Sequence, residues 1–509
     1  MYSNEEISES GILYSLWKYL TTFDGQGTLN QSKSHRCGPS FQWSLDWPQR
    51  TLFHLYTGLK TLMDEEERYT SSGGVIYETI SHSPKCQVDF SKQHESTSKP
   101  VEATNVVHNL KEIFATFKLD ANVFPAPVVH ATRDLCARYL GGIWTSLDDE
   151  DLELKAITGG MSNLLFLVRF VASKHPIGNE PTVVLLRIHC NLDTTHLLNE
   201  SVIFTLLSER SLGPKLYGVF PGGRLEQFIP SRCLKCGELS IPSLAKKIGA
   251  LIARVHALDV PTIKQPMLVE IAKKWLSKIG ETNPNMKHEL KGRMVALEKN
   301  SKYPQYVNID VLTAELNLME KCLAKSKSPV VFCHNDLQEG NILLRGDCEI
   351  GEDGALHGEY TDQPLVIIDY EYANHNYRAF DFANHMIEHI LDYSNPQPPF
   401  YFINKERYPS VEQQKELFIA YFEQLQYIEN DGQLPAHLVE EISVGREKFV
   451  EILRLETQRF LATSNLFWSI WSFMQSGNSP IEFDYVSYGL DRLILFYQSK
   501  SDLIELLDE

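Results

Sequence analysis

The sequence has no long apolar run and no framework of paired cysteines. None of its 509 residues lies in a stretch that approaches the ~18 apolar residues of a bilayer span, and the acidic start "MYSNEEISES" precedes no signal-like segment. The nine cysteines are scattered and odd in number, and the single CxxC at Cys233 and Cys236 has no partner pair at zinc spacing. We therefore expect a reduced, cytoplasmic protein with no stable membrane insertion.

Basic residues are also in short supply. The chain has 48 lysines and arginines against 66 aspartates and glutamates, for a net charge of -18. Proteins that bind nucleic acids are usually basic, so we expect no nucleic-acid partner. An acidic surface suits a small cationic substrate, although many soluble proteins are simply acidic.

Composition and periodicity divide the chain into three parts. Residues 1–127 include a long stretch rich in Ser, Thr, Lys and His without periodicity, which predicts a partly disordered extension. Residues 128–232 alternate strands and helices, with "GRLEQFIPSR" predicted as an edge strand and a crossing segment. Residues 233–509 are mostly helical. This order predicts an α+β, protein-kinase-like fold of two lobes: a small β-rich N-lobe and a large, mostly helical C-lobe.

Two buried strands flank an unusually polar loop in "VVFCHNDLQEGNILL", residues 330–344. Alone, His334 is typical of a satisfied core histidine and Asp336 of a turn cap. However, Asn341 follows Asp336 by five residues, the spacing by which protein kinases present a catalytic base and a magnesium ligand from one loop. The same spacing here predicts the same two roles.

A second strand, "PLVIID", ends in Asp369 and is followed closely by Glu371. An aspartate at the end of a buried strand corresponds to the metal-binding aspartate of kinases. A cluster of carboxylates from two buried strands is costly without a cation, which favours a magnesium site over a structural role. The polar insertion between the two motifs is predicted to form a surface hairpin.

The N-lobe carries a candidate phosphate site. The "TGGMSN" turn, from Thr158 to Asn163, lies between two predicted strands and can bring backbone N–H groups to phosphates, although an ordinary hairpin also fits. Arg187 lies inside the apolar run "VVLLRIH" and needs a partner. Glu200, near the start of the next helix, is the expected one, because kinases grip nucleotide phosphates with a strand cation paired to a helix carboxylate.

These motifs together resemble the choline/ethanolamine kinase family, and within it the choline kinases. The matching stretches include "GGMSNLLF", "LLRI", "VVFCHNDLQEGNILL", "IIDYEYANHNYRAFDFANH" and "FWSIW", across about three quarters of the chain. The resemblance implies ATP and Mg²⁺ as cofactors, choline as the substrate (with ethanolamine open) and a homodimer, since the family is commonly dimeric.

The resemblance also implies roles for individual residues. Asp336 would be the catalytic base, with Gln338 orienting the loop, Glu371 supporting the metal or substrate, and Asn341 and Asp369 binding Mg²⁺. ATP would be bound by the following residues: Thr158, Gly159, Gly160, Met161, Ser162, Asn163, Arg187 with Glu200, and the hinge Gln227, Phe228, Ile229, Pro230, Ser231 and Arg232. The substrate site would comprise Tyr372, Glu388, Tyr393, Trp468, Trp471, Phe483, Tyr485 and Tyr488.

An aromatic substrate site makes chemical sense for choline. A trimethylammonium group donates no hydrogen bonds, so aromatic faces and a carboxylate hold it best. Trp468 and Trp471 are three residues apart on a predicted helix and share a face, which ordinary core aromatics also do. Three positions depart from the family pattern: Cys190, Ala383 and His389. If His389 reaches the cation pocket, its protonation below about pH 6.5 would repel the substrate.

The sequence therefore predicts an ATP-dependent choline kinase that makes phosphocholine, the first step of the CDP-choline route to phosphatidylcholine. An ethanolamine kinase or a dual kinase is the nearest alternative, and the "QEG" of residues 338–340 favours choline by resemblance. A catalytically inactive kinase-fold scaffold is a remote alternative, because every essential polar position is filled. A protein kinase is disfavoured, since no A-P-E segment follows Asp369.

Overall fold

The computed structural model describes residues 124–157, 163–189, 194–220, 222–298, 302–477, 479 and 482–508. The predicted extension over residues 1–127 lies almost wholly outside this part of the chain, as do Thr158 to Ser162 and Cys190. The described residues form two compact units: residues 124–205 with Pro214–Phe228, and Leu206–Gly213 with residues 229–508. The chain thus passes between units at residue 228, within the predicted hinge, and Leu206–Gly213 belongs with the C-terminal unit.

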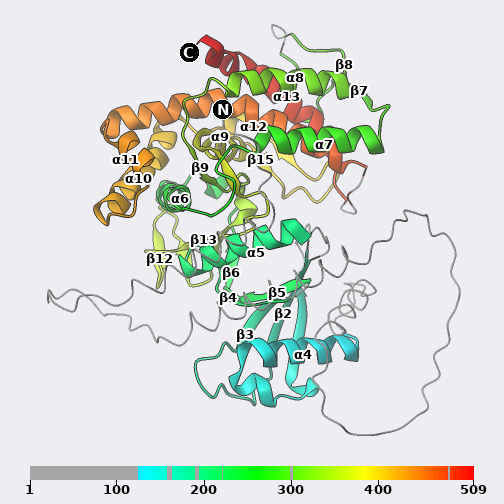
Figure 1. Ribbon diagram of the computed structural model, residues 1–509, viewed down its shortest axis with the longest axis vertical. Helices are drawn as coiled ribbons and strands as arrows, with labels where there is room; N and C mark the ends of the chain where they lie inside the picture. The colour runs from blue at the N-terminus through cyan, green and yellow to red at the C-terminus, as the bar shows by residue number, and fades with distance from the viewer. Residues whose placement is uncertain are drawn as a thin grey trace, which may run out of the picture. The chain divides into compact units, whose positions relative to one another are not determined.

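In the N-terminal unit, helix α4 packs on an antiparallel sheet (Figure 1). Helix α4 (Ala126–Leu140) buries Val128, Ala131 and Leu135, which recur at helical spacing, against Phe166 and other sheet residues. Gly141 ends the helix at φ 66°, a left-handed conformation that glycine adopts without steric cost. Two short 3₁₀ turns, Gly142–Ser146 and Asp149–Asp151, lead into the first strand.

The sheet has five strands in the order β1-β2-β3-β5-β4. Their bounds are β1 Leu152–Ile157, β2 Asn163–Phe170, β3 Val183–His189, β4 Leu216–Phe220 and β5 Gly223–Gln227. The prediction of an edge strand within "GRLEQFIPSR" is wrong, because β5 pairs on both sides and β4 forms the edge. The run "GRLEQ" alternates polar and apolar residues, which is typical of an edge, yet all but Gln227 are buried. Helix α5 (Thr194–Glu209) precedes β4 along the chain.

The C-terminal unit is mostly helical, as predicted. From residue 229 on, the α-helices of the described residues are α6 Pro242–His256, α7 Leu268–Thr282, α8 Ile309–Leu323, α9 Arg378–Glu388, α10 Val411–Asn430, α11 Ala436–Ile442, α12 Arg446–Gln475 and α13 Tyr485–Ile504. Helices α7 and α8 run side by side in Figure 1, and their apolar faces join those of α9, α12 and α13 in one core. No helix in the described residues is both long and apolar enough to cross a bilayer.

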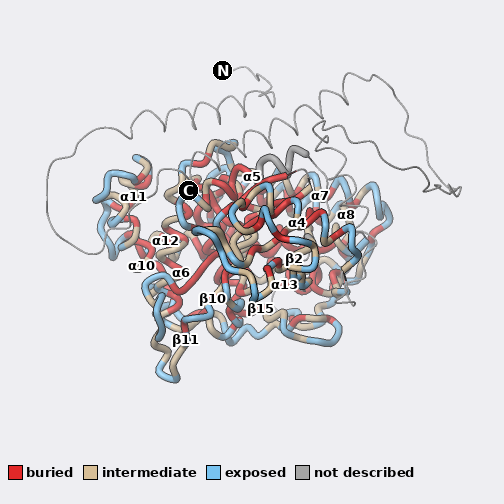
Figure 2. The backbone as a smooth tube through the Cα atoms, turned by 90° about the horizontal axis from the view of Figure 1, so that it is seen from below, coloured by how far each residue is buried: buried red, intermediate tan, exposed pale blue. Residues whose placement is uncertain are grey.

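Short strands of this unit position its polar loops. Strand β9 (Val330–Cys333) pairs with β14 (Asn374–Tyr377), while β10 (Ile342–Arg345) lies between β13 (Leu365–Ile367) and β6 (Ser231–Cys233). The predicted surface hairpin is confirmed as β11 (Cys348–Ile350) with β12 (Leu356–Gly358), and Figure 2 shows mostly exposed and intermediate colours there. The remaining strand pairs, β7–β8 and β15–β16, are Lys287–Glu289 with Tyr306–Asn308 and Leu391–Asp392 with Phe402–Ile403.

Candidate active site

The loop after β9 is held by a buried aspartate on α9. The carboxylate of Asp381 accepts hydrogen bonds from the backbone N–H groups of His334 (2.8 Å) and Asn335 (2.6 Å). Asn335 has φ 69°, a left-handed conformation that asparagine tolerates better than most residues. The carboxylate therefore fixes the direction in which the chain enters Asp336.

His256 on α6 contacts the carboxylate of Asp381 and helps to hold it in place. Its Nε2 lies 3.1 Å from Oδ2 of Asp381, and its Nδ1 lies 3.0 Å from the hydroxyl of Tyr421. Burial alone would raise the pKa of Asp381, but its hydrogen bonds with His256 and the loop N–H groups lower it. Asp381 is a positioning residue that was not predicted from the sequence, although a carboxylate between Phe380 and Phe382 was a readable signal.

Asp336 and Asn341 contact each other directly. The Nδ2 of Asn341 donates to the backbone oxygen of Asp336 (2.8 Å) and to its Oδ2 (2.9 Å). Gln338 accepts from the backbone N–H of Gly340 (3.3 Å) and closes the short turn Glu339–Asn341, which fits its predicted role in shaping the loop. Because Nδ2 of Asn341 serves Asp336, its amide oxygen is left for another ligand.

The second loop is tied to the first. Strands β10 and β13 pair antiparallel, so Asn341 just before β10 and Asp369 just after β13 lie at the same end of the ladder. The N–H of Ile368 donates to the backbone oxygen of Asn341 (3.0 Å), and Nε2 of His334 lies 2.9 Å from the backbone oxygen of Ile368. Asp369 itself has φ 64°. The predicted base and both predicted metal ligands are therefore brought together.

The electrostatics of this site favour a bound cation. Burial raises the pKa of the half-buried Asp336 well above its usual range, and the nearby carboxylates of Glu388, Asp369 and Glu371 raise it further. The available donors are carboxylate and amide oxygens, the ligands that Mg²⁺ prefers. The residues present therefore fit a magnesium ion.

A second group of potential metal ligands lies closer together, but its ligand atoms are not available to a metal ion. Ligand atoms of His256, Cys333 and Asp381 lie within 4.8 Å of one another, the one such group among the described residues. Both oxygens of Asp381 already accept hydrogen bonds, and burial raises the pKa of the Cys333 thiol well above its usual range. This group stabilises the loop rather than binding a metal.

Beside the polar loops lies a cluster of aromatic side chains. On α12, Trp468 and Trp471 share a face as predicted, with ring centroids 5.4 Å apart at 79°. Tyr372 packs edge-on against Trp468 (5.2 Å, 83°) and accepts a hydrogen bond from Nε1 of Trp471 (2.9 Å). Trp468 is buried and anchored by its Nε1 to Oδ1 of Asn384 (2.8 Å), whereas Tyr372 and Trp471 are partly exposed. Of these three residues, Tyr372 and Trp471 are therefore the ones able to contact a ligand.

The other predicted substrate residues extend this cluster. Tyr485, at the start of α13, lies 5.8 Å from Trp471 and 5.0 Å from Phe483. Phe483 in turn packs on Tyr488 (5.5 Å), whose hydroxyl lies 2.8 Å from that of Tyr393. Burial raises the pKa of Tyr372 and of Tyr488, and the negative charge of Asp336 raises both further, so the cluster adjoins the candidate base. The structure therefore brings the predicted substrate residues together in one region.

Glu388 lies in this region with both carboxylate oxygens engaged. Oε1 accepts from Nη1 of Arg492 (3.2 Å), and Oε2 accepts from the hydroxyl of Tyr393 (3.0 Å). Arg492 is fully buried on α13 and also donates to the side chain of Ser464 (3.1 Å). Arg492 was not predicted from the sequence, although an arginine followed by the apolar run "LILF" requires a partner.

The expectation for His389 is wrong. Its Nδ1 lies 2.9 Å from the backbone oxygen of His385, and the side chain lines a separate cavity of about 200 Å³ with Leu239 and Leu417. Burial, reinforced by the neighbouring His385, lowers the pKa of His389 to about 3. The imidazole therefore stays neutral near pH 6.5 and does not repel a cation.

In the N-terminal unit, Arg187 pairs with a residue that the sequence analysis did not name. Its Nε donates to Oε1 of Glu226 on β5 across 2.7 Å, and Glu226 is almost fully buried. In the β3–β5 register Arg187 lies opposite Arg224, so Glu226 separates two cations that would otherwise repel. The side chain of Glu200 lies outside the described residues, and the predicted Arg187–Glu200 pair stays a prediction.

The predicted hinge runs out of β5. The side chain of Gln227 accepts from the N–H of Lys215 (3.2 Å), and the hydroxyl of Ser231 donates to the oxygen of Ile229 (2.8 Å). Arg232 is held by a bidentate pair with Glu238 at 2.7 and 2.8 Å. Phe228 and Pro230 complete this segment. Of the phosphate turn, only the backbone of Asn163 at the start of β2 is described.

A family model for choline/ethanolamine kinases matches residues 154–497. The chain belongs to this family. It is 42% identical to "Choline kinase A2" of Caenorhabditis elegans over 418 residues, covering 78% of this chain and 92% of that protein. It is 38% identical to the human "Choline/ethanolamine kinase" over 371 residues, covering 72% and 85% of the two chains.

Two solved structures of the family have the same fold. A choline kinase from Cryptosporidium parvum gives a TM-score of 0.54 at 23% identity, covering 74% of this chain and 96% of its own. An ethanolamine kinase from Plasmodium vivax gives 0.52 at 19% identity, covering 78% and 96%. The expected protein-kinase-like fold, with a β-sheet lobe and a helical lobe, is therefore confirmed.

Proposed function

We propose that this protein transfers the γ-phosphoryl group of ATP to the hydroxyl of choline. The observation that carries the proposal is the contact of Asn341 with Asp336, beside Asp369 and next to an aromatic cluster. Asp336 accepts the hydroxyl proton as the choline oxygen attacks phosphorus and the bond to ADP breaks. The hydrogen bonds that the N–H groups of His334 and Asn335 donate to Asp381 hold the base in place for this step.

The proposal also assigns roles toward ATP and Mg²⁺ to individual predicted residues. Asn341 and Asp369 would hold the metal, which when bound neutralises charge on the transferred group. The turn at 158–163 and Arg187 would contact the phosphates, and the hinge at 227–232 would meet the adenine. The Arg187–Glu226 bond supports this role, because it keeps the guanidinium in a fixed position on the sheet.

The existing hydrogen bonds of Glu388 favour choline over ethanolamine as the substrate. A primary ammonium donates three hydrogen bonds and needs acceptors, whereas a trimethylammonium needs only faces and charge. Both oxygens of Glu388 already accept hydrogen bonds, while the rings of Tyr372 and Trp471 are partly exposed. Ethanolamine kinase activity remains the second candidate, because relatives bear both names.

Steady-state kinetics with the two alcohols side by side test the proposal. We expect a higher kcat/KM for choline, and Asp336→Asn should lower kcat by about 10²–10⁴-fold, the usual contribution of a general base. Asn is nearly isosteric and retains an acceptor for Asn341, so the circular dichroism spectrum should not change. Retention of more than about half of kcat would remove Asp336 from its role, and a preference for ethanolamine would overturn the substrate.

Phosphocholine as product would place the protein at the first step of the CDP-choline route. The cytoplasmic location rests on the scattered, odd-numbered cysteines of the sequence and the homodimer on family resemblance, and we include both in the proposal on that basis. Sedimentation of the purified chain tests the second, since a monomer at micromolar concentration would rule out a stable dimer.

A further inference from the structure

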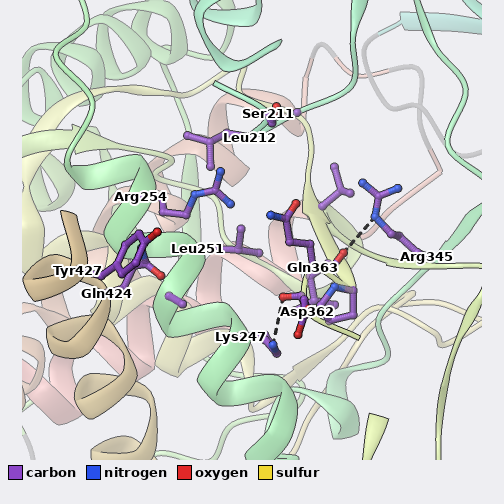
Figure 3. A pocket seen from close by; sticks show the side chains of 15 residues that line it. Ser211, Leu212, Lys247, Leu251, Arg254, Arg345, Asp362, Gln363, Gln424 and Tyr427 are labelled. Atoms are coloured by element: carbon purple, nitrogen blue, oxygen red, sulfur yellow. Dashed lines mark hydrogen bonds between the residues drawn. The ribbon is translucent and has the colours of Figure 1, made fainter. Parts of the chain in front are cut away.

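The C-terminal unit contains a cavity lined by residues other than those of the aromatic cluster. It has a volume of about 330 Å³, within the range of small-molecule pockets. Helix α6 contributes Lys247 and Arg254, seven residues apart and hence on one face, and the end of β10 contributes Arg345. Figure 3 shows Arg254 extending toward the side chain of Gln363, with Lys247 and Arg345 on other sides of the same space.

The three cations have few partners. Arg254 donates from Nη2 to the backbone oxygen of Arg210 at 3.3 Å, Arg345 from Nε to that of Gln363 at 3.1 Å, and Lys247 to that of Asp362 at 3.1 Å. None of the three forms a salt bridge with a carboxylate of the described residues. Burial lowers the pKa of Arg254, with an opposing contribution from Tyr370, because the guanidinium is partly removed from water. Most of its donors are therefore available to a ligand.

The positive charge of this cavity contrasts with the net negative charge of the whole protein. The chain carries a net charge of -18, yet only one carboxylate, that of Asp362, lines the cavity beside the three cations. Guanidinium groups present several donors in a plane that matches the oxygens of a phosphate, and a lysine adds a point charge. The amide of Gln363 provides a further donor at the centre. We propose that this cavity binds a small phosphomonoester.

The site is distinct from the candidate active site. Arg345 and Leu365 lie at one end of the β10–β13 ladder, whereas Asn341 and Asp369 lie at the other. Four residues of extended strand separate the two ends, a distance of about 13 Å. The proposal therefore does not depend on the kinase assignment, and binding can be measured without Mg²⁺, ATP or choline.

Calorimetric titration of the full chain tests the proposal, with inorganic phosphate and glycerol 3-phosphate as probes. Arg254→Gln and Arg345→Gln should each weaken binding roughly tenfold, as expected when a charge-assisted hydrogen bond is lost. Lys246→Gln is the matched control, because this neighbouring lysine of α6 is exposed and pairs with Glu416 (2.9 Å). Its affinity should stay within about twofold of wild type.

Several outcomes would overturn the proposal. These are no saturable binding by wild type, equal losses in Lys246→Gln and Arg254→Gln, or no loss in either arginine variant. If Arg254→Gln does not fold, Lys247→Gln replaces it. An unchanged affinity in both Lys247→Gln and Arg345→Gln would then overturn the proposal. Binding to phosphatidic acid vesicles but not to glycerol 3-phosphate would mean that a lipid surface, not a small ligand, is recognised.

Discussion

Arg492 donates a hydrogen bond to Glu388 across 3.2 Å, and both side chains are buried. A buried ion pair is costly to break, because the remaining charge is left without a partner in a medium that solvates it poorly. Glu388 therefore holds Arg492 in the core between α9 and α13 as well as adjoining the substrate region. This structural role was not visible from the family resemblance, which assigned Glu388 to the substrate alone.

The first prediction concerns this pair. Glu388→Gln should lower the free energy of unfolding by about 3–5 kcal/mol, the usual cost of orphaning a buried charge. Adding Arg492→Met should restore part of it, measured by urea denaturation in a double-mutant cycle. Tyr393→Phe is the control: it removes one hydrogen bond from Glu388 and should cost only about 0.5–1.5 kcal/mol. Additive losses for Glu388 and Arg492 would mean that the two side chains act independently.

The second prediction concerns magnesium. Asp369→Ala and Asn341→Ala should each raise the Mg²⁺ concentration needed for half-maximal activity, or abolish activity, because each removes an oxygen ligand. Asn341→Asp is the informative comparison, since it keeps an oxygen ligand but loses the Nδ2 donor to Asp336. It should retain a near-normal magnesium midpoint with a reduced kcat. An unchanged magnesium titration in either alanine variant would remove that residue from the ligand set.

Much of the fold was readable because hydrophobic periodicity and turn residues act locally. The strands around the polar loops, the α12 face with Trp468 and Trp471, and the surface hairpin all follow from such patterns. The position of β5 inside the sheet was not readable, because strand order depends on pairing between distant segments. The Arg187–Glu226 bond has the same origin: its two residues are 39 positions apart and meet only through the β3–β5 register.

Two supporting residues were missed for a related reason. Asp381 and Arg492 touch neither proposed ligand directly; they act through the His334–Asn335 backbone and through Glu388. Motif spacing identifies groups that share one loop, whereas these contacts join helices to loops far away in the chain. Their visible signal was a charge with apolar neighbours in the sequence, which requires a partner but does not name it.

The third prediction is that the protein loses stability at acidic pH because of Glu180 in the N-terminal unit. Burial alone would raise the pKa of Glu180, but hydrogen bonds from the N–H groups of Ile143, Ile177 and Gly178 lower it to about 2. A folded-state pKa below the unfolded value near 4.3 stabilises the fold above that pH, and the stabilisation is lost as the pH falls toward 2.

Thermal melts across pH test this relation. Wild type should melt above Glu180→Gln at pH 7, and the gap should close between about pH 4.5 and pH 2. Glu153→Gln is the control, because its exposed pair with Arg169 contributes little to stability. A gap between wild type and Glu180→Gln that stays constant down to pH 2 would mean that the carboxylate charge is not what stabilises this loop.

The last prediction separates ligand contact from core packing within the aromatic cluster. Trp471 is partly exposed, whereas Trp468 is 5% exposed and bonded to Asn384. A cation–π contact is worth about 0.5–2 kcal/mol, so Trp471→Ala should lower kcat/KM for choline by between twofold and thirtyfold. The loss for ethanolamine should be smaller, because its ammonium is bound mainly through hydrogen bonds.

Trp468→Phe should give the opposite pattern. Loss of the Nε1 bond leaves the buried oxygen of Asn384 with one donor fewer, which should cost about 1–3 kcal/mol of stability. The ring remains, so the ratio of kcat/KM for choline to that for ethanolamine should stay close to wild type. The measurements are kcat/KM for both alcohols and urea unfolding for each variant. If Trp471→Ala lowers kcat/KM equally for choline and ethanolamine and also destabilises the fold, then Trp471 is a core residue, and the aromatic faces do not select the substrate.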